Sequence, residues 1–84
     1  MEAYVATFHT HLAALRSCRA LQGAGDTGAR MAPVPRVLSS SCGTCVLYRG
    51  EDPLVERMAA DLEAVYRVEG KRYVLVHREE ERAD

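Results

Sequence analysis

Seven residues, Ser39 to Cys45, bring four hydroxyls, two thiols and a glycine together as SSSCGTC. A thiol reacts through its thiolate, so a working Cys42 needs neighbours that favour negative charge. The candidates are hydroxyl or backbone donors, a flexible backbone position and a nearby cation: Ser40, Ser41, Gly43 and Arg36. The alternative is a buried cysteine in a turn with solvated serines, because cysteine is among the most buried residue types. The loop by itself leaves both interpretations open.

Cys45 follows Cys42 with the C-x-x-C spacing of dithiol redox motifs. Those motifs usually stand at a helix start, where the helix dipole favours the thiolate. Here the second cysteine enters TCVLYRG, residues 44–50, whose composition is typical of a strand. Alternation would place Cys45 and Leu47 on one face of that strand. The pattern favours a packing role for Cys45, while a small thiol redox protein that uses both cysteines stays open.

Metal binding is the other chemistry that paired cysteines suggest. A structural zinc site wants about four ligands, and only His9 and His11 of FHTH could join Cys42 and Cys45. The sequence has no second C-x-x-C and no H-x₃₋₅-H motif to complete the site, and at a strand-to-helix junction the two histidines are more typical of surface or capping residues. We therefore expect no metal and no cofactor. Cys18 falls on the apolar face of a predicted helix, and we assign it to the core.

Size and charge exclude several function classes. A chain of 84 residues has room for one small domain, and its net charge of −1 offers no basic excess for nucleic acid. No stretch approaches the roughly 20 apolar residues that cross a bilayer, and MEAYVATFHTH lacks the pattern of a signal peptide. Three cysteines do not suggest a disulfide framework, so we expect a cytoplasmic protein. Because such a small core is marginal, a homodimer would be a natural remedy.

The first half of the chain predicts a strand and a helix. AYVATF, residues 3–8, alternates like a strand, and Thr10 can cap a helix that we expect to end near Gln22. Arg16 and Ser17 should lie away from the apolar face of this helix. That face consists of Ala14, Leu15, Cys18 and Leu21.

The middle of the chain predicts two extended segments and a second helix. Prolines make residues 30–37 an edge strand or an irregular extended passage, and residues 44–50 form the next strand. Asp52 and Pro53 suit the start of a helix. Its buried face would consist of Leu54, Val55, Met58 and Leu62.

The last part of the chain predicts a hairpin of residues 63–68 and 72–77, followed by a frayed, charged tail at 79–84. The resulting order is β-α-β-β-α-β with an extra strand. This order predicts an α+β, ferredoxin-like sandwich in one domain, residues 1–78, with two helices on one face of an antiparallel sheet. The fold hosts many functions, so the site must identify the function.

Three segments of the chain resemble one family: PVPRVLSSSCGTCVLYRGED, the opening YVATFHTHLAALRSCRAL and the later VYRVEG. The family is described as "Putative Se/S carrier protein-like" and consists of small bacterial proteins. The likeness covers nearly the whole chain, and the cysteine loop is its specific part. Cys42 takes the place of the family's loop cysteine, with Pro35 and Arg36 before it and Gly43 after it. Cys45 departs from the single-cysteine form of the family.

The resemblance implies a thiol that holds sulfur or selenium as a persulfide or selenosulfide and passes it from a donor protein to an acceptor protein. On this interpretation Cys42 carries the atom, and the protein is a carrier rather than a turnover enzyme. Cys45 lies so near that it would tend to discharge a persulfide into a disulfide. The alternative from another class is a non-catalytic interaction module that pairs an edge strand or hairpin with a partner or a second copy.

Overall fold

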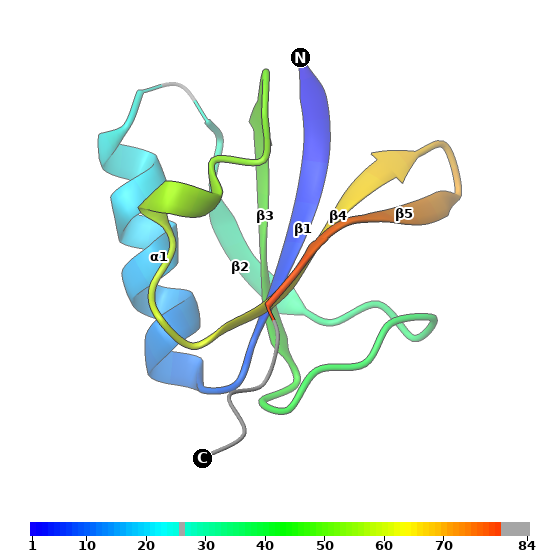
Figure 1. Cartoon of the computed structure of the whole chain (residues 1–84), viewed down its shortest axis with the longest axis horizontal. Helices are drawn as coiled ribbons and strands as arrows, with labels where there is room; N and C mark the ends of the chain where they lie inside the picture. The colour runs from blue at the N-terminus through cyan, green and yellow to red at the C-terminus, as the bar shows by residue number, and fades with distance from the viewer. Residues whose placement is uncertain (26, 80–84) are drawn as a thin grey trace.

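The computed structural model describes residues 1–25 and 27–79. They form a five-stranded antiparallel sheet with one α-helix packed on one face (Figure 1). Along the sheet the strands lie in the order β2-β3-β1-β4-β5. The elements are β1 (Glu2–Phe8), α1 (His11–Gly23), β2 (Arg30–Pro33), β3 (Thr44–Gly50), the 3-10 turn η1 (Val55–Arg57), β4 (Leu62–Glu69) and β5 (Arg72–Arg78).

Strand β1 is the centre of the sheet and is buried on both faces. It pairs with β3 and β4, so that Val5 lies opposite Leu47 on one side and Tyr66 on the other. Every residue from Tyr4 to Phe8 is buried. The alternation predicted for residues 3–8 is therefore confirmed, with Tyr4, Ala6 and Phe8 in the core beneath α1.

Helix α1 begins and ends close to the predicted positions, because its cap is a local signal. Thr10 Oγ1 accepts from the Ala13 N–H at 3.1 Å. The buried face is rotated from the prediction: Leu15 is only half-buried, while Ser17 is 1% exposed. The expectation that Ser17 lies away from the core was wrong, because its Oγ accepts from the Ala59 N–H at 2.8 Å. This contact ties α1 to the segment that precedes β4.

The predicted second helix is wrong. The segment after β3 makes only η1, because Leu54 has left-handed backbone angles, φ 55° and ψ 36°, that an α-helix cannot contain. Asp52 does not cap a helix: its Oδ1 accepts from the Leu54 N–H at 2.8 Å and closes a local turn. Tyr48 Oη then donates to the Pro53 carbonyl and holds this turn against β3.

The fold is thus α+β with an antiparallel sheet, as predicted, but the two-helix, ferredoxin-like arrangement is not confirmed. Residues 30–37 form a strand only as far as Pro33, at the β2 edge of the sheet. The predicted hairpin is confirmed as β4 and β5, which turn through Gly70 at φ 63°. Of the predicted tail, the Glu79 N–H donates to the Glu63 carbonyl at 2.9 Å, and residues 80–84 lie outside the described residues.

Among the described residues, no helix is both long enough and apolar enough to cross a membrane.

Candidate thiol site

The loop that carries Cys42 connects β2 to β3. At its base the Val34 N–H donates to the Gly43 carbonyl at 3.1 Å, next to the paired residues Pro33 and Thr44. Gly43 has a φ of 73°, a conformation in which a side chain would be strained. The loop therefore returns to β3 immediately after Cys42, and the tight return requires the glycine.

Cys42 is half-buried and packs against the core cluster beneath α1. Its Sγ donates to the Thr44 carbonyl at 3.4 Å and lies 3.8 Å from Ser40 Oγ. A thiol can donate to a carbonyl oxygen, so this contact holds the sulfur against the backbone of Thr44. For the Cys42 sulfur to react, its hydrogen bond to the Thr44 carbonyl must break.

Glu63, on β4, anchors the serines that precede Cys42. Its Oε1 accepts from the Ser41 N–H at 2.9 Å and from Ser40 Oγ at 3.1 Å, and its Oε2 accepts from Ser41 Oγ at 3.1 Å. Ser40 Oγ also lies 2.9 Å from the Phe8 carbonyl, so its one hydrogen is shared between two oxygens. The serines bind the scaffold and hold the loop in place. Sequence analysis missed Glu63, whose only local signal is a carboxylate at the start of a β-rich run.

Both histidines of FHTH contact the same loop. His9 Nδ1 lies 3.3 Å from Ser41 Oγ and 3.7 Å from Glu63 Oε2, and His11 Nδ1 lies 3.4 Å from Thr44 Oγ1. Cys42 therefore stands between Ser41, in the loop, and Thr44, the first residue of β3, and each of these two residues contacts a histidine. Helix α1 starts at His11, so the loop runs beside the N-terminal end of the helix (Figure 1). Sequence analysis favoured surface or capping roles for these histidines over metal binding and did not anticipate these contacts.

Arg36, the cation expected to favour the Cys42 thiolate, lies in the part of the loop that follows β2. It is exposed in a turn that the Leu38 N–H closes on the Pro35 carbonyl at 3.0 Å. Within the described part of the chain, Arg36 makes no hydrogen bond or ion pair with Cys42.

The other two thiols are enclosed. Cys18 is 4% exposed on α1 and Cys45 is 0% exposed on β3, and burial raises the pKa of both. Cys45 Sγ donates to the Pro33 carbonyl at 3.7 Å. None of the three cysteines forms a disulfide. Cys42 is thus the thiol with the greatest access to solvent.

The described residues contain no group of three or more histidine, cysteine or acidic side chains arranged to hold a metal ion. The histidines and Cys42 instead bond to hydroxyl and carbonyl groups of the loop.

Comparison with protein families gives a match that covers most of the chain. The model of the family described as "Putative Se/S carrier protein-like" matches residues 3–67, which is more than half of the chain. The chain belongs to this family. The match to the Se/S carrier-like family runs from β1 through most of β4 and includes the cysteine loop and Glu63. No curated protein and no solved structure matches the chain.

Proposed function

We propose that the protein carries a sulfur or selenium atom on Cys42, as a persulfide or selenosulfide, between a donor and an acceptor protein. Membership of the Se/S carrier-like family supports this proposal. The accessibility of the three thiols assigns the proposed role to Cys42. Cys42 is half-buried in a loop, whereas Cys18 and Cys45 are enclosed. A thiol that exchanges atoms with another protein must be reachable.

Loading with sulfur is a thiol exchange in which atoms and electrons balance. The Cys42 thiolate attacks the outer sulfur of a donor persulfide, the sulfur–sulfur bond of the donor breaks, and the donor leaves as a thiolate. Cys42 then holds the outer sulfur as its own persulfide, and the Cys42 proton passes to solvent or to the donor. Attack by an acceptor thiolate on the same outer sulfur reverses the sequence and releases Cys42.

The contacts of the loop suit this exchange because they fasten its backbone and leave the thiol lightly held. Glu63 holds Ser40 and Ser41, and the Val34 N–H closes the loop base. The sulfur has one carbonyl acceptor, on Thr44, and one hydroxyl neighbour. Releasing a single weak thiol hydrogen bond would expose the sulfur while the loop stays in place.

The test is loading followed by discharge. Reduced protein is incubated with a small-molecule persulfide, and the peptides are mapped by mass spectrometry. We expect one added sulfur on the Cys42 peptide, its removal by an acceptor thiol, and no loading of Cys42→Ser. Cys45→Ala is the matched control, and it should load like the wild type because the Cys45 sulfur is enclosed. A wild-type protein that never loads, although Cys42 is reduced and alkylates readily, would contradict the proposal.

The same variants also test the alternative that the protein is a small thiol redox protein that uses Cys42 and Cys45. If Cys45 resolves the persulfide, Cys45→Ala should prolong the life of the loaded state and abolish a Cys42–Cys45 disulfide that forms in the wild type. The complete burial of Cys45 and its contact with Pro33 favour unchanged loading.

An interaction module is the second candidate, favoured by β5. This seven-residue strand lies at one end of the sheet, and within the described part of the chain one of its sides is unpaired and could pair with a partner or a second copy. Partner binding that survives Cys42→Ser, in a protein that does not load, would support this function. Size measurement by light scattering would identify a homodimer.

A further inference from the structure

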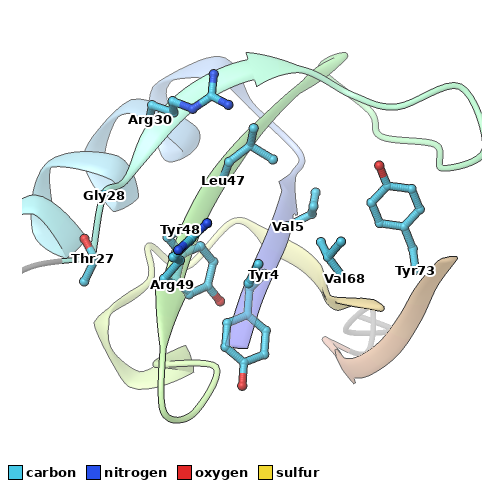
Figure 2. A pocket seen from close by; sticks show the side chains of 11 residues that line it. Tyr4, Val5, Thr27, Gly28, Arg30, Leu47, Tyr48, Arg49, Val68 and Tyr73 are labelled. Carbon is cyan, nitrogen blue, oxygen red and sulfur yellow. The ribbon is translucent and has the colours of Figure 1, made fainter. Parts of the chain in front are cut away.

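A groove lies on the face of the sheet that α1 leaves uncovered. It has a volume of about 340 Å³ and takes side chains from four strands, β1, β3, β4 and β5, and from Arg30 of β2 (Figure 2). Cys42 packs on the other side, against the core beneath α1. The groove is therefore separate from the thiol and has no role in the exchange proposed above.

The curvature of the sheet creates this groove. Arg30 and Tyr73 belong to the two edge strands, which are four strand spacings apart in the order β2-β3-β1-β4-β5. In a flat sheet that separation would be about 19 Å, because neighbouring strands are about 4.8 Å apart. Both residues line one groove, so the sheet curls around it (Figure 2). A concave site of this size is within the range of small-molecule sites.

The floor of the groove is apolar, and one of its walls is aromatic. Val5 and Leu47 are directly paired on β1 and β3, and Val68 pairs with Tyr73 on β4 and β5. Figure 2 shows these side chains around the same hollow. Aliphatic side chains and a tyrosine ring together suit a flat hydrocarbon or aromatic body.

Two arginines supply the charge. Arg30 pairs in register with Leu47, and Arg49 is two residues further along β3, so both belong to the groove face. Residues in this diagonal relation have side chains about 7–8 Å apart at their base, within reach of one shared anion for a long guanidinium. Among residues 1–25 and 27–79, no acidic side chain lines the groove, and neither arginine makes an ion pair. In a protein of net charge −1, this pairing of cations is a local feature of the groove.

We propose that this groove binds a small organic anion with a flat apolar body. The body would lie on Val5, Leu47 and Val68 beside the Tyr73 ring, and the carboxylate, sulfonate or phosphate head would bond to Arg30 and Arg49. Guanidinium groups bind such heads through paired, charge-assisted hydrogen bonds. An inorganic anion would leave the partly exposed Leu47, Val68 and Tyr73 side chains in contact with water, and a neutral hydrocarbon would make no bond to the arginines.

The test compares two fluorescent probes that share one aromatic body. Anilinonaphthalene sulfonate carries the anionic head, and phenylnaphthylamine lacks it. We expect saturable binding of one sulfonate probe per protein and at least about tenfold weaker binding of the neutral probe, because it forfeits the charge-assisted bonds. Amide chemical-shift changes on adding the sulfonate should centre on Val5 and Leu47. Benzoate should displace the probe, and inorganic phosphate should not.

Substitution of each groove arginine tests whether Arg30 and Arg49 bind the anionic head of the probe. Arg30→Gln and Arg49→Gln should each weaken the sulfonate probe about five- to tenfold and leave the neutral probe unchanged. Arg19→Gln, an exposed substitution on α1, is the matched control and should change neither affinity. Urea unfolding of each variant checks that the fold is intact. The proposal would be overturned if both probes bound with equal affinity or if neither groove substitution changed the affinity for the sulfonate probe. It would also be overturned if inorganic phosphate displaced the probe as readily as benzoate, or if the shift changes centred on the Cys42 loop.

Discussion

Glu63, on β4, anchors the cysteine loop through its side-chain carboxylate. Its two oxygens accept three hydrogen bonds from Ser40 and Ser41, and its side chain is 20% exposed. A hydrogen bond to a charged group contributes more than a neutral one, and partial burial preserves part of that advantage. The position of Cys42 therefore depends on a carboxylate from a different part of the chain.

We predict that Glu63→Ala loosens the loop and costs about 1–2 kcal/mol of unfolding free energy, because three donors lose their acceptor. The Ser41 amide should exchange with deuterium faster, and Cys42 should alkylate faster. Glu63→Gln should give a smaller effect, since it retains one acceptor oxygen for Ser41. Glu51→Ala, an exposed acid with no hydrogen bond among the described residues, is the control. Unchanged exchange at Ser41 in Glu63→Ala would contradict the anchoring role.

At the scale of elements, the segment between β3 and β4 takes the place of a second helix. Asp52, Pro53 and the spacing of the following apolar residues are good local signals for a helix start. The tertiary contacts of this segment override these local signals. Leu54 and Val55 still pack against the core, but they reach it from a left-handed residue and a single 3-10 turn. Apolar spacing thus predicted correctly that these side chains pack on the core, where they are partly buried, but it predicted the backbone conformation wrongly.

Ser17 should be the residue whose loss most affects this segment. Its buried hydroxyl accepts from the Ala59 N–H at 2.8 Å, and Ser17→Ala would leave that donor without its acceptor. We predict a loss of about 1–3 kcal/mol in unfolding free energy, measured by urea denaturation. Ser39→Ala, at an exposed loop position, should cost little. If the two alanine variants were equally stable, the contact between α1 and the segment would not matter for folding.

At the scale of the whole molecule, burial makes the folded protein sensitive to alkaline pH. Burial raises the pKa of the Cys18 and Cys45 thiols, and it raises the pKa of the Tyr48 phenol strongly. In the unfolded chain, thiols ionise near pH 8.5 and phenols near pH 10. The folded state therefore keeps protons that the unfolded state has lost, and this contribution to stability is full below about pH 8.5.

We predict that the free energy of unfolding falls as pH rises above about 8.5 and falls more steeply above about pH 10. Urea denaturation at a series of pH values measures it. Tyr48→Phe should be less stable at neutral pH, because the Pro53 carbonyl loses its donor, and should show a shallower decline above pH 10. Stability that rose with pH over this range would reverse the sign of the linkage and contradict the assignment.

Local signals in the sequence determined β1, the capped start of α1, β3 and the final hairpin, because each depends on alternation, a cap or a turn among neighbouring residues. They also identified the Cys42 loop and its glycine. The tertiary structure alone decided what surrounds the sulfur, since Glu63, His9 and Ser41 meet across separations of 22 and 32 residues. It likewise decided the turn at Leu54 and the groove between Arg30 and Tyr73. Contacts between distant segments and the curvature of a paired sheet arise only when the whole chain is folded, so no local pattern records them.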